Sequence, residues 1–499
     1  MRRRAKTTPE TGDAVRLTPV PPRRPFEWPP FVERLVEVAP DPARLYLVGG
    51  IVRDALRGLP GQDFDLATPD DGLQVARRLA DALGGAYYPV DAERRTGRVL
   101  LERPEGQIVI DVASLRGSQP DDDVERALLA DLEGRDFTIN AMAVRLDTLD
   151  LLIDPLGGQH DLFEDKLLRQ CRPTSIREDP IRALRAVRLA LQFNLHMTPD
   201  TSRAARETAP LLVDSDGRLL QPERARDELF KMLKGPRPAA ALRLLHTLGL
   251  LEALVPFPLP DGETLEERFR VVERLAALFA IISPLRDDNT AAELILGVAV
   301  MVLDRYRRQL QEHLAREFAA GRSLTALLLL GAFTPRGVLS GEAWAEHLHL
   351  SKAESRTLSL LERTRHFELV AFPPVDERWM HRYYRATGEV GVDGVLLALA
   401  EYLAAHPIEI DPVEWGRLLE EVAAPLLDAF FRRHQHVVAP PPLVTGEDLI
   451  RELGLSPGPQ IGQILKQLLE EQAAGTIRTK KQALRLAGRL ASASPDNNG

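Results

Sequence analysis

The sequence predicts an α/β domain followed by a long all-α region. Between residue 44 and about residue 143, short apolar runs alternate with amphipathic helical spacing, which indicates strands interleaved with helices. From about residue 161 onwards, almost every apolar pattern repeats with the period of a helix. The 499 residues suggest about three domains of roughly 150 residues, and the 44% hydrophobic content is ample for packed cores.

Composition excludes several classes of protein. The net charge of −9 leaves no global basic surface, so a nucleic-acid partner would need local basic patches. The single cysteine, Cys171, rules out an internal disulfide framework, a CxxC zinc site and an iron–sulfur cluster, and it suits a cytoplasmic location. The longest apolar runs are shorter than the roughly 18–20 residues that span a bilayer, so we expect no membrane contact. The sequence indicates no protein partner.

The α/β elements follow from local signals taken in chain order. An apolar run before Gly49-Gly50 indicates a strand with a tight exit, and the helix after it stops at Gly58 and Pro60. A second helical pattern ends at Gly84-Gly85. We therefore expect strands at 45–48, 64–67, 99–101 and 108–113, helices at 51–57 and 73–83, and a strand or helix edge at 137–144.

Both ends of the chain are expected to be disordered. Residues 1–30 are rich in arginine and proline and lack the apolar segment of a secretory signal, so we expect a basic arm. Weak contact with RNA is the functional alternative for this arm. Residues 492–499 form a polar tail.

Asp63-Phe64-Asp65 is the sharpest local feature. Side chains at i and i+2 leave the same face of a strand, so the two carboxylates converge while Phe64 points into the core. Like charges this close repel unless a cation lies between them, and Mg²⁺ prefers such oxygen ligands. Asp111 lies in the apolar run 108–112, where it is either a third metal ligand or the outward-facing residue of a half-buried strand.

Gly49-Gly50 is a candidate phosphate-binding turn. Its glycines let backbone N–H groups approach a phosphate, and the N-terminus of the following helix favours an anion. Arg53 adds a guanidinium fork for phosphate oxygens. A P-loop is excluded because the chain has no GxxxxGK[ST] motif.

Five motifs together resemble those of class II tRNA nucleotidyltransferases and bacterial poly(A) polymerases, in the order found in that family. They correspond to motif A, motif B, the hinge motif between head and neck, motif D and motif E. The matching segments are 49–54 with 63–68, 135–141, 154–162, 178–185 and 223–229.

The resemblance implies a role for each matching residue. Asp63 and Asp65 would hold two Mg²⁺ ions, and Asp111 would activate the 3′-hydroxyl of the primer. The residues implied to contact the nucleotide are the triphosphate contacts Gly49, Gly50 and Arg53, the ribose and phosphate contacts Arg135 and Asp136, the base-reading pair Asp179 and Arg182, and the phosphate-binding or base-orienting residues Arg185 and Arg188.

The spacing within motif D is compatible with base reading. Arg182, Arg185 and Arg188 are three residues apart and cover about half of a helix circumference, opposite an apolar face. The alternative is a solvated charged face on which Asp179 caps the helix before Pro180. Arg182 lies in the first turn, where it opposes the helix dipole, and this argues against the alternative.

The chain departs from the family in two places. Gly134 stands where the family usually has a second arginine before motif B, which would weaken one phosphate or primer contact. The arginine-rich strand typical of proteobacterial poly(A) polymerases is absent after Asp63-Phe64-Asp65. This second departure favours tRNA end synthesis over poly(A) synthesis.

The carboxyl-terminal half resembles the family more faintly. Many relatives have an HD phosphohydrolase segment around 327–333, but the metal-binding His-Asp pair is missing here. Because His347, His349 and His366 are scattered, we expect a degenerate, metal-free HD-like body. The tail contains a candidate RNA-binding patch, or else a solvated terminal helix, at Arg478, Lys480, Lys481 and Arg485.

The fold implied by the resemblance is a polymerase-β-like nucleotidyltransferase head followed by an all-α neck, body and tail. The expected segments are the basic arm at 1–30, the head at 31–160, the neck with its nucleotide-selecting helix at 161–260, the HD-like body at 261–375, the RNA-binding tail at 376–491 and the disordered end at 492–499.

The resemblance implies an enzyme that adds CMP, CMP and AMP to tRNA 3′ ends from CTP and ATP, without a nucleic-acid template and with release of pyrophosphate. Two Mg²⁺ ions would support the displacement. CC-adding, A-adding and poly(A)-adding activities are open alternatives within the same enzyme class. The non-enzymatic alternative is a tRNA-binding protein on an inactive transferase fold, and the intact pair of Asp63 and Asp65 argues against it.

Overall fold

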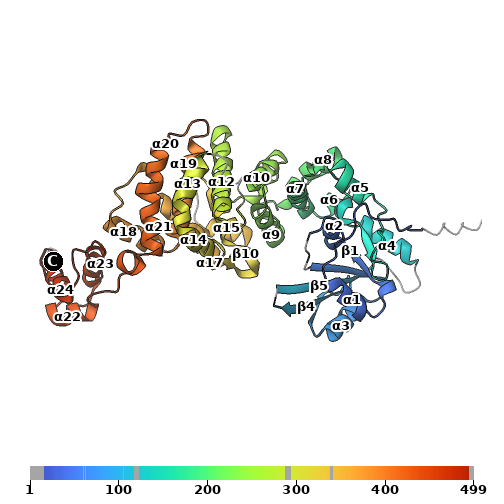
Figure 1. Cartoon of the computed structure of the whole chain (residues 1–499), viewed down its shortest axis with the longest axis horizontal. Coiled ribbons are helices and arrows are strands. Elements are labelled where there is room, and N and C mark those ends of the chain that lie inside the picture. Colours follow the sequence, from blue (N-terminus) through green and yellow to red (C-terminus); the bar gives the residue numbers. More distant parts are fainter. Residues whose placement is uncertain are drawn as a thin grey trace, which may run out of the picture. The chain divides into compact units, whose positions relative to one another are not determined.

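The computed structural model describes residues 16–59, 61, 63–104, 106–116, 123–286, 294–337 and 341–493. Of the segments expected to be disordered, residues 1–15 and 494–499 lie outside the described residues. Residues 492 and 493, also expected to be disordered, instead end the last helix, Lys480–Ala493. The chain divides into two compact units, Met1–Leu212 and Val213–Gly499. This division falls inside the expected neck. Figure 1 shows the mixed unit in blue to green and the helical unit in green to red.

The first unit combines a sheet with helices. Its helices are α1 (Phe31–Val38), α2 (Gly50–Leu56), α3 (Gly72–Leu83), α4 (Val124–Glu133), α5 (Gly158–His160), α6 (Ser175–Glu178), α7 (Ile181–Phe193) and α8 (Pro199–Thr208). Its strands are β1 (Tyr46–Val48), β2 (Asp63–Thr68), β3 (Ala86–Asp91), β4 (Thr96–Arg103), β5 (Gly106–Ser114), β6 (Ala143–Arg145), β7 (Leu167–Leu168) and β8 (His196–Met197).

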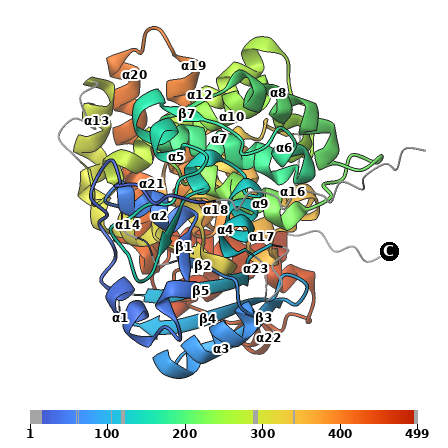
Figure 2. The same ribbon diagram turned by 90° about the vertical axis from the view of Figure 1, so that its right-hand side faces the viewer.

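Among the described residues, one sheet of six strands has the order β3-β4-β5-β2-β1-β6. β2 and β5 pair in parallel, and the other neighbours pair antiparallel. α1 and α3 cover one face of the sheet, where Phe64 and Ile110 are buried in the core (Figure 2). α4 packs on the opposite face against β1 and the end of β2. Because side chains alternate along β2, Asp63 and Asp65 lie on the face opposite α3.

Two elements of the sheet differ from the sequence-based expectation. β3 is not predicted because it is an exposed edge strand that contains Pro89, so it lacks apolar alternation. Residues 137–144 do not form a single strand or helix edge. They form a 3₁₀ turn, Thr138–Asn140, followed by the start of β6, and the turn is held where Thr138 N donates to the Arg169 carbonyl oxygen at 2.9 Å.

Residues 16–30 pack against the first unit, although the sequence predicts that they belong to a disordered arm. Val20 and Leu152 pair through two backbone hydrogen bonds of 2.7 and 2.9 Å. The Trp28 indole Nε1 donates to the Leu149 carbonyl oxygen at 3.1 Å. Val20 and Trp28 also pack on the core of the sheet. Apolar burial at these anchors outweighs the arginine- and proline-rich composition.

The second unit is helical apart from the short pair β9 (Glu317–Phe318) and β10 (Arg322–Ser323) in its described residues. Its helices are α9 (Pro222–Leu233), α10 (Pro238–Thr247), α11 (Leu251–Leu254), α12 (Gly262–Ile282), α13 (Leu294–Leu303), α14 (Arg307–Leu314), α15 (Leu324–Phe333), α16 (Gly341–Leu348), α17 (Lys352–Arg365), α18 (Glu377–Thr387), α19 (Val390–Ala405), α20 (Pro412–Arg417), α21 (Ala424–Phe431), α22 (Gly446–Leu453), α23 (Pro459–Ala473) and α24 (Lys480–Ala493). Across the part of the chain that is described, every helix is too short or too polar to cross a membrane.

The histidines of the body make contacts that the sequence does not reveal. His347 Nε2 lies 2.9 Å from the Ala253 carbonyl oxygen. His313 and Asp393, which are 80 residues apart, form a buried pair with 2.7 Å between Nε2 and Oδ1. This pair brings together α14 and α19, so it contributes to the helical core.

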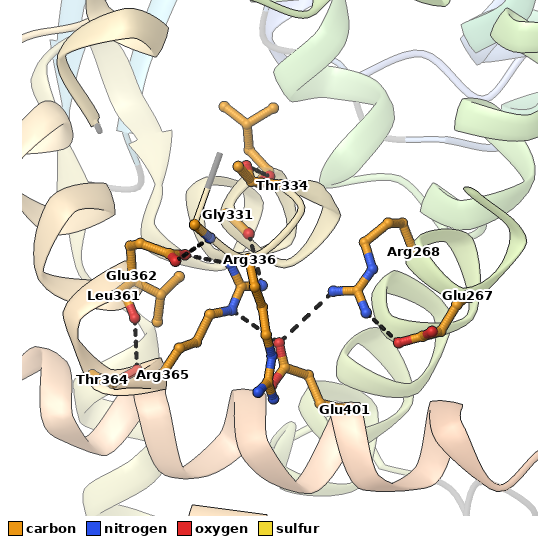
Figure 3. A network of polar contacts seen from close by, with 12 residues as sticks. Glu267, Arg268, Gly331, Thr334, Arg336, Leu361, Glu362, Thr364, Arg365 and Glu401 are labelled. Carbon is orange, nitrogen blue, oxygen red and sulfur yellow. Dashed lines mark hydrogen bonds and ion pairs between the residues drawn. The ribbon is translucent and has the colours of Figure 1, made fainter. Parts of the chain in front are cut away.

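Glu401 on α19 anchors a network of arginines inside the second unit (Figure 3). Arg365 Nε donates to Glu401 Oε1 at 2.9 Å, and Arg268 Nη1 lies 3.8 Å from the same oxygen. Arg336 is also ion-paired with Glu401. The side chains of Arg268, Arg365 and Glu401 are 7%, 4% and 6% exposed. Arg268 also pairs with Glu267, and Arg365 also pairs with Glu362. Glu401 is thus the carboxylate shared by guanidinium groups from α12, α17 and the segment after α15.

We expect Glu401→Gln to lower the free energy of unfolding by about 3 kcal/mol, because it removes the negative charge that the buried guanidinium groups of Arg268 and Arg365 share. Glu420→Gln is the matched control, since Glu420 pairs with Arg305 where both side chains are nearly half exposed. Its loss should cost about 1 kcal/mol or less. Thermal and urea unfolding measure both variants. Equal stability of the two would show that the buried network does not hold the second unit together.

Candidate active site

The carboxylates of Asp63, Asp65 and Asp111 lie on the face of the sheet opposite α3. The parallel register of β2 and β5 places Asp65 directly beside Asp111, and Asp63 precedes Asp65 on the same face. Asp63 and Asp65 are exposed to solvent. The surrounding protein nevertheless raises the pKa of Asp65. Desolvation is the main cause, Arg135 opposes it, and the negative charges of Asp111 and Asp63 add to it.

Arg98 on β4 holds Asp111. Its Nε donates to Asp111 Oδ1 at 2.7 Å and its Nη2 to Oδ2 at 2.8 Å, and these hydrogen bonds raise the pKa of Arg98. Arg98 is not among the residues predicted from the sequence. Its signal is a charged residue just before Val99 and Leu101, which alternate into the core. Any role of Asp111 in proton transfer requires Arg98 to release or share one of its oxygens.

The Gly49 turn brings Arg135 to the carboxylates. Gly49 has φ of +79°, a conformation that favours glycine. A Cβ at this position would lie 2.8 Å from Arg135 Nη1 and 3.5 Å from Asp65 Oδ2, so the guanidinium and the carboxylate both lie against the turn. Arg135 Nη2 also donates to Asp131 Oδ2 at 3.1 Å. Asp131 was not identified from the sequence, although it lies one helical turn before Arg135.

Arg53 supports the Gly49-Gly50 turn from within the protein. Its Nε and Nη2 donate to the two Asp54 carboxylate oxygens at 2.9 Å, and its Nη1 donates to Asn140 Oδ1 at 2.5 Å. Its guanidinium carbon lies 4.4 Å from the centre of the Phe193 ring. The sequence predicts a contact with a triphosphate, but such a contact would compete with these three partners.

The buried Asp136 pairs with the partly exposed Arg185. Arg185 Nη1 donates to Asp136 Oδ2 at 2.9 Å, while Asn140 Nδ2 and the Phe137 N–H donate to Oδ1 at 3.0 and 2.7 Å. Burial alone would raise the pKa of Asp136, but Arg185 and the hydrogen bonds hold it below its ordinary value. Asp136 therefore orients Arg185 and the chain around it, rather than presenting an open carboxylate to a ribose.

Arg182, in the first turn of α7, faces the main chain of motif B. Its Nη1 lies 3.3 Å from the Arg135 carbonyl oxygen and its Nη2 lies 3.1 Å from that of Gly134. Its Nε lies 3.8 Å from Asp179 Oδ2. The sequence predicts Arg182 on the base-reading face with Arg188, whose Nη1 instead contacts Gln192 Oε1 at 3.1 Å. The structure thus places α7 against motif B.

The carboxylate oxygens of this site suit a hard divalent cation, but they do not form a complete metal site. Asp63 and Asp65 offer carboxylate oxygens from one strand face, which is the ligand chemistry that Mg²⁺ prefers. In the described part of the chain, however, no three His, Cys, Asp or Glu side chains converge as a preformed metal site. Both carboxylate oxygens of Asp111 accept hydrogen bonds from Arg98.

The basic patch expected in the tail lies on and just before α24. Arg478, Lys480, Lys481 and Arg485 are exposed. Lys480 is ion-paired, with its Nζ 2.6 Å from Asp448 Oδ1, and this contact lowers the pKa of Asp448. Lys481 and Arg485 lie one helical turn apart on the exposed side of α24.

Three segments match protein families. Residues 45–169 match the poly(A) polymerase head domain, and residues 194–259 match a "probable RNA and SrmB-binding site of polymerase A". Residues 432–487 match tRNA nucleotidyltransferase domain 2.

Full-length relatives extend these matches. An A-adding tRNA nucleotidyltransferase of Deinococcus radiodurans is 32% identical over 463 residues, which are 91% of this chain and 98% of the relative. A CC-adding tRNA nucleotidyltransferase of Geobacter sulfurreducens is 30% identical over 453 residues, 90% of this chain and 93% of the relative. A solved structure of a CCA-adding enzyme with ATP matches with a TM-score of 0.64 and 22% identity over 93% of this chain and 96% of that chain.

The solved structure supports the fold, and it confirms the expected α/β head followed by helical neck, body and tail. The two relatives also show the family of this chain, because each alignment spans nearly the whole of both chains. The chain is therefore an enzyme, a nucleotidyltransferase of the tRNA nucleotidyltransferase and poly(A) polymerase family.

Proposed function

We propose that this enzyme extends the 3′ ends of tRNA without a nucleic-acid template, adding CMP, CMP and AMP in turn from CTP and ATP and releasing pyrophosphate. One observation carries the proposal. Paired carboxylates, a glycine turn and the Arg135 guanidinium meet on one sheet face, where a triphosphate and an acceptor hydroxyl can be held together. The names of the relatives supply tRNA as the acceptor. The cytoplasmic location is part of this proposal.

The residues of the sheet face supply the chemistry of transfer. Asp63 and Asp65 would hold two Mg²⁺ ions, which neutralise phosphate charge when bound. Arg135 contributes a further positive charge beside the Gly49 turn, where backbone N–H groups approach the triphosphate. Asp111 accepts the proton of the 3′-hydroxyl after Arg98 releases one of its oxygens.

Helix α7 would select the base. Asp179 and Arg182 lie beside motif B, and rotation of Arg182 away from the carbonyl oxygens of that segment would let the pair bind the edge of a cytosine or adenine. Arg185 and Arg188 would orient that edge or bind phosphates. In the tail, the exposed cations Lys481 and Arg485, with Arg478 and Lys480, would follow the tRNA backbone.

A partial activity is the second candidate. It is favoured by a specific observation, since the A-adding relative and the CC-adding relative both align over nine-tenths or more of this chain. Under this alternative the same site adds only the two CMP residues or only the terminal AMP, and a second enzyme completes the tRNA end.

Extension of defined acceptors at single-nucleotide resolution separates these activities. Transcripts of tRNA that end before CCA, after C and after CC are each offered CTP, ATP or both, with Mg²⁺. We expect addition through CCA and then arrest. Addition of CC alone or A alone would replace the full activity with a partial one, and a long A tail would indicate a poly(A) polymerase. No addition to any acceptor would contradict the proposal.

We expect Asp65→Ala to abolish nucleotide addition while leaving the protein folded, because it removes one of the two carboxylates that share the open face of β2. Glu102→Gln is the matched control, as an exposed carboxylate on β4 of the same sheet. The extension assay gives the rates, and circular dichroism checks the fold. Normal turnover by Asp65→Ala would exclude Asp65 as a catalytic metal ligand.

A further inference from the structure

The sheet face that carries the carboxylates continues past β2 and β5 to the edge strand β3. Asp65 on β2 aligns with Asp111 on β5, and Asp111 aligns with Arg98 on β4. Arg98 in turn aligns with Tyr88 on β3. Side chains paired in this way leave the same face of a sheet. One row of this face therefore runs from the carboxylates across β4 to Tyr88.

Tyr88 is an aromatic residue that lies outside the core. Its side chain is 51% exposed, whereas every other phenylalanine, tyrosine and tryptophan in the described ranges is buried or half-buried. Within the same ranges Tyr88 forms no hydrogen bond and no ring contact. The neighbouring Tyr87 points to the opposite face, where it packs on the core of the sheet. Packing within the protein therefore does not account for the ring of Tyr88.

Apolar side chains adjoin Tyr88 on the same face. Leu100 on β4 pairs with Val109 on β5 and with Ala86 on β3, which is two residues before Tyr88. Leu100 and Val109 are half-buried, and Ala86 is exposed. Helix α3 lies on the other side of β4 and β5 and leaves this face uncovered (Figure 1). These four residues form an apolar platform beside Asp111.

The strand order separates the platform from the turn proposed to hold the triphosphate. The order is β3-β4-β5-β2-β1, and Gly49 directly follows β1. The platform and the Gly49 turn therefore lie on opposite sides of the carboxylates. In phosphoryl transfer the attacking and leaving oxygens are roughly in line, on opposite sides of the phosphorus. With pyrophosphate leaving at the turn, the acceptor hydroxyl approaches over Asp111, and its nucleoside extends towards β3.

The spacing and the charge of the platform suit a nucleobase. Neighbouring strands are about 4.8 Å apart, so the Cα atoms of Tyr88 and Asp111 are separated by about 10 Å. A nucleoside with its 3′-hydroxyl at Asp111 can lie over Arg98 and reach the ring of Tyr88. The exposed Glu102 carboxylate, two residues after Leu100, adds negative charge that disfavours a phosphate here. An uncharged base can instead stack on the ring and the apolar side chains.

We propose that Tyr88 is a base-stacking residue of this enzyme and that the platform receives the 3′-terminal base of the RNA acceptor. The proposal rests on the function proposed above and adds to it the place of the acceptor. Stacking tolerates different bases, because every base has a π face. A stacking contact can therefore hold an acceptor whose terminal base changes with each nucleotide added.

The test begins with Tyr88→Ala. The matched control is Val90→Ala, which shortens another exposed apolar residue of β3, beyond the shift in register at Pro89. We expect Tyr88→Ala to weaken binding of tRNA about 10-fold, the loss typical of one stacked base, and to leave the KM values for CTP and ATP unchanged. Tyr88→Phe and Tyr88→Trp should retain the affinity for tRNA. Fluorescence anisotropy of labelled tRNA and steady-state kinetics measure these effects. Weaker binding of CTP or ATP with unchanged binding of tRNA would overturn the proposal.

An acceptor that lacks its terminal base tests the contact directly. A tRNA transcript with an abasic 3′-terminal nucleotide keeps the hydroxyl and the phosphates. We expect the wild-type enzyme to bind it about 10-fold more weakly than the intact acceptor. Tyr88→Ala should bind the two acceptors equally. A wild type that binds both equally, or a Tyr88→Ala variant that still prefers the intact acceptor by the full factor, would contradict the assignment.

A purely structural role of Tyr88 at the sheet edge gives a different result. It would lower the melting temperature of Tyr88→Ala and leave the affinity for tRNA unchanged, and this outcome also overturns the proposal. If Tyr88→Ala does not fold, Tyr88→Leu keeps an apolar side chain without a π face and should show the same loss of affinity. The binding assays do not require turnover. An inactive wild-type enzyme would contradict the proposed function, whereas an active wild type with unaltered binding by the variants would contradict only the inference about Tyr88.

Discussion

The parallel pairing of β2 with β5 is the constraint on which the site depends. It sets Asp65 beside Asp111 and draws three carboxylates to one sheet face, where their mutual repulsion must be balanced. The fold supplies cations from both sides. The neighbouring strand β4 contributes Arg98, and the segment after α4 contributes Arg135. The strand order therefore fixes the charge balance as well as the shape of the site.

Contacts of arginine side chains also hold helix α7 to the domain that contains the sheet. Main-chain oxygens of motif B accept hydrogen bonds from Arg182, and Asp136 accepts one from Arg185. At the other end of α7, the Phe193 ring contacts the guanidinium groups of Arg53 and Arg57, each 4.4 Å from its ring centre. The helix proposed to read the base is thus held to the α/β core at both ends.

Local features of the site could be predicted from the sequence, and partnerships between distant segments could not. The Asp63-Phe64-Asp65 alternation and the Gly49-Gly50 turn were predictable because strand periodicity and glycine chemistry act over a few residues. The partner of Asp111 was not, because Arg98 reaches it through strand pairing. The inward direction of Arg182 likewise depends on carbonyl oxygens 47 and 48 residues earlier in the chain.

The packing of residues 16–30 bears on how this protein is divided for study. Composition alone would place the start of a minimal head at residue 31, since everything before it looks like a soluble arm. Such a fragment would lack the strand-like bridge at Val20 and the indole contact of Trp28, and the Glu27 carboxylate, which lies against Gly58, would be lost with them. A fragment or fusion that keeps the native head must begin before Val20, so this segment is part of the folding unit.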